Sequence, residues 1–242
     1  MNISGSGKIA AGEYNEEISM SGSGRLDGNV RCKSLNCSGS VKGSGNVVCS
    51  EDAEFSGSCH IDESLSAKNI YASGSLKVGG DVIGKGEVKL SGGISCGGSL
   101  KCESFDCSGG LEVGGDIEAE EIRISGAIKC GGLMNAEKIA INIDGHNNSS
   151  RVGSIGGGEI KIQSKANKVK RKLLLNKIIG CNGRLRVDEL IEGDVIALEN
   201  VTVPKVVGRI IAIGAGCEVN FVQYSEKIEI HPNAKVEKYE KI

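Results

Sequence analysis

The sequence predicts an all-β protein, a right-handed parallel β-helix of about 17–18 residues per coil with a smaller C-terminal β segment. Two observations carry this prediction: a Ser-Gly dipeptide returns at nearly constant spacing, and apolar and polar residues alternate in short runs between its copies. The composition agrees, with 37 glycines but only 2 prolines and no tryptophan in 242 residues. Such a chain is neither collagen-like nor a disordered linker.

The Ser-Gly dipeptide divides the first part of the chain into coils of almost one length. Successive copies are 17 or 18 residues apart, and the coils that they mark extend to about residue 141. The copies are Ser4-Gly5, Ser21-Gly22, Ser38-Gly39, Ser56-Gly57, Ser73-Gly74, Ser91-Gly92, Ser108-Gly109 and Ser125-Gly126.

Each coil is expected to hold three short strands joined by corners. In the stretch SGGLEVGGDIEAEEIRI, the runs Leu111-Glu-Val113, Ile117-Glu-Ala119 and Ile122-Arg-Ile124 each place two residues on one face and one on the other. Ser, Gly, Asn and Asp suit the corners, because Gly tolerates positive φ and the others bond locally to the backbone. One coil cannot bury its inward side chains alone, so coils must stack at the strand spacing of about 4.8 Å.

Aligning the coils gives six columns of inward residues, two for each strand. Column four is small in most coils, whereas columns five and six are mainly aliphatic. In the first coil the alignment puts Glu13 in column three and Asn15 in column four. The sixth column is Met20, Cys37, Phe55, Ala72, Leu90, Cys107, Ile124 and Ile141.

The hand of the coil is the less direct part of the prediction. Left-handed β-helices of hexapeptide acyltransferases use an 18-residue coil, and Val113-Gly-Gly-Asp-Ile117 is similar to their repeat unit. Most coils here have 17 residues, so one of the three faces of each coil is a residue shorter than the other two. Such coils do not form the regular triangular prism of the left-handed β-helix. We therefore favour the right-handed form.

The chain is expected to divide into three parts. Residues 1–162 are expected to form the β-helix, and residues 163–183 a basic amphipathic connector for which a helix is one of the expected conformations. Residues 184–242 are expected to form a smaller β stack or a continuation of the β-helix. Within the connector, basic and leucine residues adjoin one another, which favours either a cap on the open end of the β-helix or a contact with a membrane surface. These residues are Lys168, Lys170, Arg171, Lys172, Leu173, Leu174 and Leu175.

Composition and motifs give little indication of chemistry. The net charge of −2 offers no argument for nucleic acid. No secretory or membrane-spanning apolar run is present, so a cytoplasmic location is expected, with the inner face of the membrane as a peripheral site. Ten cysteines in that compartment are expected as reduced thiols. No CxxC pair occurs, so the eight that fall in inward columns are interpreted as core residues: Cys32, Cys37, Cys49, Cys59, Cys96, Cys102, Cys107 and Cys130.

No catalytic, metal or cofactor site is expected. His60, His146 and His231 are isolated from any nucleophile at motif spacing. Polysaccharide-active β-helix enzymes wall a cleft with long loops, whereas the corners here are tight up to residue 141 and aromatic residues are 3% of the chain. A small-molecule substrate and an enzymatic role are therefore the less favoured alternative.

The outward residues of the first strand form a mostly basic stripe along the coils. We favour an ordinary charged face, with corner acids such as Asp27, Asp52, Glu63 and Asp81 as counter-charges, over a docking strip for an anionic surface. The outward residues are Lys8, Arg25, Lys42, His60, Lys77, Ser95, Glu112 and Lys129.

The coil length, the Ser-Gly corner and the Cys/Val/Ile columns resemble the bactofilins, bacterial polymer-forming cytoskeletal proteins. The segment IEGDVIALENVTVPKVVGRIIAIGAGCEVNFVQYSEKIEI (191–230) is similar to the C-terminal portion of their Firmicute-type members. The resemblance implies a right-handed β-helix that assembles without nucleotide into nonpolar filaments, often at the inner membrane, and serves as a scaffold. This chain departs from the family in its long interruption and second β segment.

Elementary physics favours self-association independently of that resemblance. The end coils of a β-helix carry unpaired backbone groups, which recruit another strand unless they are blocked. We therefore expect a structural scaffold that polymerises end to end, with Ile3 and Ile9 nearest the junction and another copy of the chain as the partner. The alternative is a monomeric adaptor or membrane-surface module that uses the basic stripe or the connector.

Overall fold

The computed structural model describes residues 1–144, 150–165 and 183–242, and all regular structure in these ranges is β. Strands β1 to β9 are Asn2–Ile3, Ser6–Ile9, Gly12–Glu13, Ile18–Met20, Ser23–Leu26, Val30–Cys32, Leu35–Cys37, Ser40–Gly43 and Val47–Cys49. Strands β10 to β18 are Ala53–Phe55, Ser58–Ile61, Leu65–Ala67, Ile70–Ala72, Ser75–Val78, Val82–Gly84, Glu87–Cys96, Leu100–Lys101 and Ser104–Val113. Strands β19 to β26 are Ile117–Glu118, Glu121–Asp144, Ser150–Lys165, Leu185–Val187, Leu190–Leu198, Val201–Ile213, Glu218–Ile230 and Lys235–Lys241.

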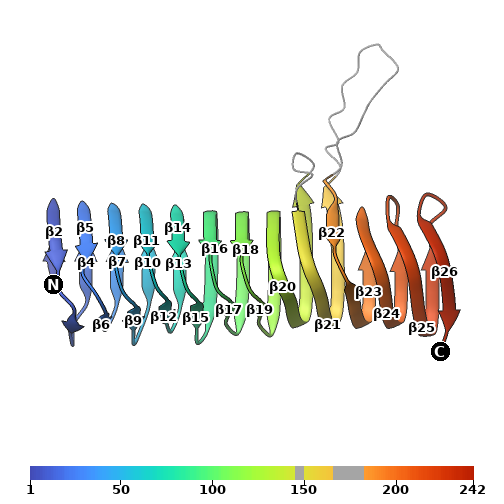
Figure 1. Ribbon diagram of the computed structural model, residues 1–242, viewed down its shortest axis with the longest axis horizontal. Helices are drawn as coiled ribbons and strands as arrows, with labels where there is room; N and C mark the ends of the chain where they lie inside the picture. Colours follow the sequence, from blue (N-terminus) through green and yellow to red (C-terminus); the bar gives the residue numbers. More distant parts are fainter. Residues whose placement is uncertain (145–149, 166–182) are drawn as a thin grey trace, which may run out of the picture.

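The strands stack along one axis as a solenoid of about 13 turns, with the two termini at opposite ends (Figure 1). Successive coils pair in parallel, as when β16 lies between β14 and β18. The prediction of an all-β parallel β-helix is confirmed. The right-handed winding stays a prediction, because parallel pairing is common to both hands.

The predicted columns are continuous ladders in the structure. In column six, Cys37 is the register partner of Phe55, and Leu90 is the partner of Cys107. The ladder lies in the core over most of its length and includes the fully buried Leu90 and Ile124. Its members are Ile3, Met20, Cys37, Phe55, Ala72, Leu90, Cys107, Ile124, Ile141, Ile162, Leu198, Ile213 and Ile230.

The first coil differs from the alignment by one residue. Gly12, not Glu13, pairs with Val30 in column three. Tyr14, not Asn15, therefore follows in column four, where its ring packs against the core. The physical reason is burial: the alignment would have placed a carboxylate and an amide inward, whereas the observed register directs Glu13 to solvent and the ring inward.

The strands after residue 183 continue the same ladders. Strand β22 pairs with β21 from Ser150 to Val152, and β23 pairs with β21 from Ile155 to Ile162. Cys217, which the sequence alignment left outside the columns, is 1% exposed in the core. It precedes Glu218, the partner of Thr202, and so stands in column one beside Val201. Its misplacement arose because this part of the chain lacks the Ser-Gly marker.

The Ser-Gly corner excludes side chains because adjacent coils approach closely there. A Cβ on Gly57 would overlap the carbonyl oxygen of Gly39, and one on Gly39 would overlap that of Gly22. The neighbouring corner residue Gly93 has open space instead, with no atom within 4 Å of a Cβ. The glycine of each Ser-Gly dipeptide is thus required by the short distance between stacked coils at this corner.

We expect Gly57→Ala to destabilise the fold by about 1–3 kcal/mol, because a methyl group forced against the carbonyl oxygen of Gly39 must push two coils apart. Gly93→Ala is the matched control and should change stability by less than about 0.5 kcal/mol. Chemical denaturation of both variants measures the difference. Equal stabilities would contradict the steric explanation of the corner.

Candidate functional site

The two end coils are the places where the repeating structure of the solenoid stops. At the N-terminal end, β1, β2 and β3 pair only with the coil below, through β4, β5 and β6. At the opposite end, β26 pairs only with β25. Each end therefore presents a row of backbone N–H and C=O groups on one side of its strands. In the part of the chain that the structure describes, no helix covers either row.

The sequence-predicted contacts Ile3 and Ile9 both lie in the N-terminal coils. Ile9 is 2% exposed in column two, whereas Ile3 is half-buried in column six. The Ile3 side chain occupies the space that a side chain on Gly7 would need in column one. Of the two residues, Ile3 therefore offers the accessible apolar surface, and Met1 beside it is 44% exposed.

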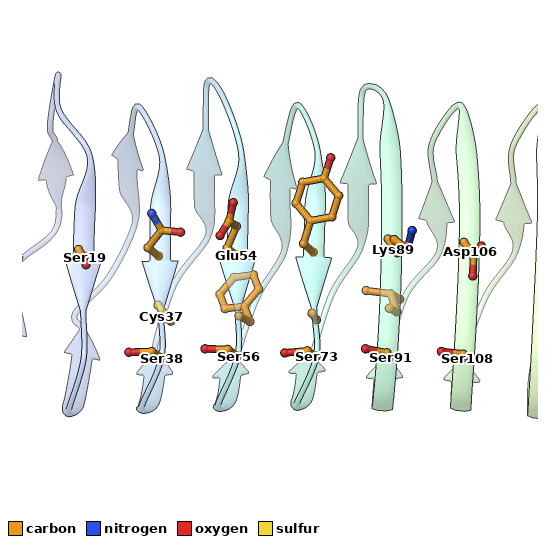
Figure 2. A pocket seen from close by; sticks show the side chains of 15 residues that line it. Ser19, Cys37, Ser38, Glu54, Ser56, Ser73, Lys89, Ser91, Asp106 and Ser108 are labelled. Atoms are coloured by element: carbon orange, nitrogen blue, oxygen red, sulfur yellow. The ribbon is translucent and has the colours of Figure 1, made fainter.

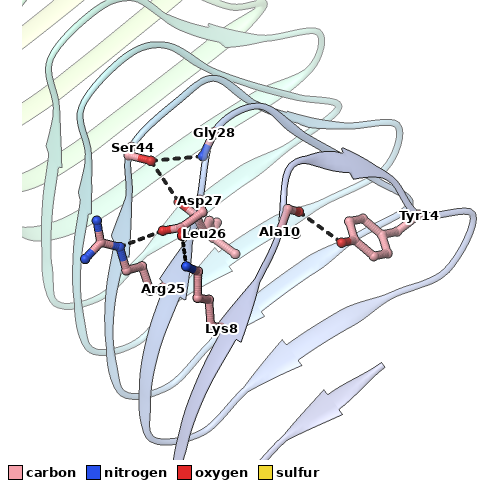
Figure 3. A network of polar contacts seen from close by, with 8 residues as sticks. All are labelled: Lys8, Ala10, Tyr14, Arg25, Leu26, Asp27, Gly28 and Ser44. Atoms are coloured by element: carbon pink, nitrogen blue, oxygen red, sulfur yellow. Dashed lines mark hydrogen bonds and ion pairs between the residues drawn. The ribbon is translucent and has the colours of Figure 1, made fainter.

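Polar contacts hold the first coil in shape without covering its edge. The amino group of Met1 donates to the Glu16 carboxylate at 2.8 Å and to the carbonyl oxygen of Glu17. The Tyr14 hydroxyl donates to the carbonyl oxygen of Ala10 at 2.9 Å (Figure 3). Both contacts lie within the first coil, so the strand edge stays ordered and accessible.

The C-terminal edge exposes more large apolar side chains than the N-terminal one, although most residues of β26 are charged. It consists of β26 and of residues 227–230 of β25, which have no register partner beyond β24 among the described residues. Ile230 is 36% exposed, Tyr239 56% and Ile242 65%. Val236 packs against the core below. Several exposed large apolar side chains thus lie where the ladder ends, and others lie on the side walls at Ile83, Leu133 and Val195.

The comparisons with known proteins give a limited likeness. No protein-family model and no solved structure matches the sequence. A stretch of 93 residues is 32% identical to the uncharacterized protein YhbF of Bacillus subtilis (strain 168). The match covers 38% of this chain and 35% of YhbF, so about a third of that relative's length is represented.

The basic stripe is confirmed as an outward row, with Lys8, Arg25 and Lys42 in register on neighbouring coils. Asp27 makes ion pairs with Lys8 and with Arg25, whose Nε lies 2.6 Å from the carboxylate (Figure 3). The hydrogen bond from Lys8 is the main reason that the pKa of Asp27 is lowered.

His60, another member of the stripe, has its Nε2 3.0 Å from the Asp62 carboxylate. Arg151 and Arg186 continue the same row beyond Lys129, and Asp188 accepts hydrogen bonds from both. Of the predicted counter-charges, Asp27 fulfils that role. Asp81 instead accepts a backbone hydrogen bond from Ser99 at 2.8 Å. Part of the stripe thus has carboxylate neighbours, whereas no ion pair is found for Lys42, Lys77 or Lys129 among the described residues.

A shallow groove of about 570 Å³ runs along the third strand of several coils (Figure 2). Glu54, Tyr71, Lys89 and Asp106 follow one another on its wall in successive coils. Glu54 and Asp106 are three coils apart, roughly 14 Å at the spacing of paired strands. Paired carboxylates that hydrolyse a glycosidic bond stand about 5–9.5 Å apart, so these two do not meet that requirement.

The predicted inward cysteines are buried free thiols in the structure. Burial raises the pKa of Cys59, Cys102 and Cys107 to about 12 and that of Cys96 and Cys130 to about 11, and these thiols are therefore protonated near neutral pH. Among the described residues, no group of three or more Cys, His, Asp or Glu side chains is arranged to hold a metal ion.

The proposed capping or membrane-contact residues between Lys168 and Leu175 lie outside the described residues. The start of the predicted connector, from residue 163 to 165, belongs to β21. Within the ranges described, no helix has the length and apolar character needed to cross a membrane.

We expect Cys59→Val to reduce the loss of stability between pH 9 and pH 12. The folded-state pKa of this thiol is about 12 against an ordinary value of 9.0, because burial disfavours the thiolate. Its stabilising contribution is complete below pH 9 and is lost as the pH rises through 12, since the unfolded chain ionises first.

At pH 10 the wild type should therefore have lost on the order of 1 kcal/mol that the variant retains. Valine is a suitable replacement because Val41 and Leu76 are the column neighbours of Cys59. Urea denaturation of the wild type and of Cys59→Val at pH 8 and pH 10 measures how the free energy of unfolding of each protein changes with pH. Parallel pH profiles would show that ionisation of Cys59 is not coupled to unfolding.

Proposed function

We propose that this protein is a structural scaffold that assembles end to end, without nucleotide, into filaments of stacked solenoids. The single observation that supports the proposal is the pair of open edges: two rows of unpaired strand backbone, with Met1, Ile230 and Tyr239 exposed beside them. Natural sheets usually block such edges with a helix, a bulge or a proline. Here no helix covers the described edges, and Pro232 lies in the corner between β25 and β26, outside both strands.

The magnitudes favour association when the backbone and apolar contacts act together. A junction equivalent to the β24–β25 rung would bring ten Cα pairs into register. At roughly 0.5–1.5 kcal/mol per hydrogen bond, such a rung contributes about 5–15 kcal/mol, which is close to the roughly 4–15 kcal/mol lost as translational and rotational freedom. Burial of the exposed Tyr239, Ile230 and Ile242 at the junction then adds the free energy that makes association favourable.

The remaining features fit a scaffold better than an enzyme. Described side walls carry ion-paired charge and a groove whose carboxylates are too far apart for glycoside hydrolysis. The buried free thiols fit a reducing compartment, so we place the scaffold in the cytoplasm, with the inner membrane surface as its peripheral site. The coil length and Ser-Gly corner support a bactofilin-like role.

Sedimentation velocity over a range of protein concentrations tests the proposal. The wild type should form species of increasing mass that negative-stain electron microscopy resolves as thin filaments. Ile230→Asp should lower the assembled fraction at a given concentration by about tenfold or more, because it buries a charge at the junction.

Ile83→Asp is the matched control, since Ile83 is 41% exposed on a side wall of the solenoid rather than at an end. It should assemble as the wild type does. A wild type that stays monomeric at every concentration and salt condition would refute the proposed function.

A further inference from the structure

We propose that Cys32 and Cys49 are a redox-active thiol pair, which a hydroperoxide converts into a disulfide between two adjacent coils. The pair lies in column four, where β6 pairs with β9 and Cys32 is the register partner of Cys49. Neither residue belongs to an end coil, so this inference is independent of the proposed end-to-end assembly. It goes beyond the scaffold function because it assigns a reaction to residues of the core.

The contact between these two cysteines differs from the surroundings of the others. Their sulfur atoms lie 3.6 Å apart in the buried interior. The other described cysteines have no cysteine in the same column of the coil before or after them. Cys96 and Cys130, for example, donate hydrogen bonds to backbone carbonyl oxygens instead. Among the described residues, the spacing of the coils thus brings one pair of thiols together.

The geometry of the pair suits a disulfide. Register partners on parallel strands have Cα atoms about 4.8 Å apart, within the range of about 4.4–6.8 Å that a disulfide spans. A sulfur–sulfur bond measures about 2.05 Å, so the two atoms must approach by roughly 1.5 Å. Column four has room for this side-chain rotation, because Ala67 and Gly84 follow Cys49 in the next two coils. We therefore expect the bond to form while β6 and β9 stay paired.

A pocket of about 500 Å³ gives a small oxidant access to the pair. Both cysteines line this pocket, together with four charged side chains, of which Arg31, Lys33 and Lys85 are basic and Glu13 is acidic. Lys33 also pairs with Glu51 at 3.4 Å. Basic groups near a thiol favour the thiolate, which is the nucleophilic form of cysteine. The pocket therefore combines access with a setting in which a thiolate can form.

The two thiols differ in how readily they ionise. The pKa of Cys32 is lowered from its ordinary value because the Cys49 thiol donates a hydrogen bond to the Cys32 sulfur, an effect that burial opposes. The same hydrogen bond and burial raise the pKa of Cys49. Burial raises the pKa of the other described cysteines as well. We therefore expect Cys32 to be the attacking thiolate and Cys49 the thiol that resolves the intermediate.

The reaction consumes one equivalent of hydrogen peroxide. The Cys32 thiolate attacks a peroxide oxygen, so that an S–O bond forms, the O–O bond breaks, and the departing hydroxide takes the proton that Cys32 lost and becomes water. Sulfur is thereby oxidised by two electrons to a sulfenic acid, and the peroxide is reduced. The Cys49 thiol then attacks this sulfur: the S–S bond forms, the S–O bond breaks, and the hydroxyl group leaves with the Cys49 proton as a second water.

Two thiols alone do not make a zinc site. Structural zinc is bound by four nitrogen or sulfur ligands, and the described residues contain no group of three or more Cys, His, Asp or Glu side chains that could hold a metal ion. Asn15 and Ser66, which also line the pocket, are not zinc ligands of this kind. The arrangement thus favours redox chemistry of the pair over metal binding.

The disulfide would join the second and third coils covalently. Opening of the N-terminal coils would then no longer separate β6 from β9, whose contact in the reduced protein depends on hydrogen bonds and packing. A dithiol reductant would reverse the change by thiol–disulfide exchange. The pair is thereby a reversible modification site that responds to peroxide.

Treatment of the folded protein with an excess of hydrogen peroxide tests the inference. Free thiols are then blocked with N-ethylmaleimide in denaturant at mildly acidic pH, where thiol–disulfide exchange is slow, and peptide mass spectrometry identifies the linked cysteines. The wild type should lose two of its ten free thiols, and the linked peptides should contain Cys32 and Cys49. Dithiothreitol should restore both thiols.

Two alanine variants separate pairing from mere exposure. Cys49→Ala removes the resolving thiol, so peroxide should form no disulfide and should leave a sulfenic acid at Cys32 that dimedone labels. Cys102→Ala is the matched control: Cys102 lies in the same column and is 9% exposed, against 6% for Cys32 and 4% for Cys49, yet has no cysteine beside it. This variant should lose two thiols as the wild type does. Thermal melts before oxidation should show that both variants are folded.

Ten free thiols in the treated wild type would overturn the inference, as would a disulfide between any other two cysteines. Oxidation of Cys102 before the pair would also overturn it, because exposure rather than pairing would then select the reacting thiol. These results are separate from those of the sedimentation experiment, so the thiol pair and the end-to-end assembly can fail independently.

Discussion

The hydrogen bonding and side-chain stacking between successive coils are the constraint on which the rest of this structure depends. A single coil holds about six inward residues and cannot remove them from water by itself, because its two open sides expose them. Inward residues are fully buried where a coil has neighbours on both sides, as at Leu100 and Ile117 in the middle of the solenoid, whereas most inward residues of the end coils are partly exposed. The stability of each coil therefore depends on the coils next to it, and each interior coil in turn stabilises both of its neighbours.

Much of this fold could be predicted from the sequence, because stacking imposes a period that a reader can count. The Ser-Gly corner fixes coil length through a close approach of backbones, so the positions of Phe55, Leu90 and Ile124 on one ladder follow from spacing alone. For the first coil, the register predicted from this spacing was wrong by one residue. Its corner after Ile9 takes three residues to reach Gly12, whereas Leu26 reaches Val30 in four, and spacing from the dipeptide cannot reveal that difference.

The last coils were harder to place for a different reason. From Leu198 to Ile213 one turn takes only 15 residues, and Glu199-Asn200 stands at the corner where the earlier coils have Ser-Gly. The available signal was the alternation in β24 and β25, which places Cys217 inward. The candidate ends were predictable as a consequence of the fold, yet their chemistry was not: the exposure of Tyr239 and the burial of Ile9 depend on how the edge coils are covered.

A solenoid of repeated coils also constrains where function can be specified. Along the side walls, each outward residue faces equivalent residues one coil away, so a feature such as the Lys8–Asp27–Arg25 cluster resembles the Arg151–Asp188–Arg186 cluster elsewhere on the molecule. Specific recognition needs a position that differs from its neighbours, and the edges supply it. In the proposed assembly, a junction between two end coils would bury their inward residues in the same way that stacking buries them between coils.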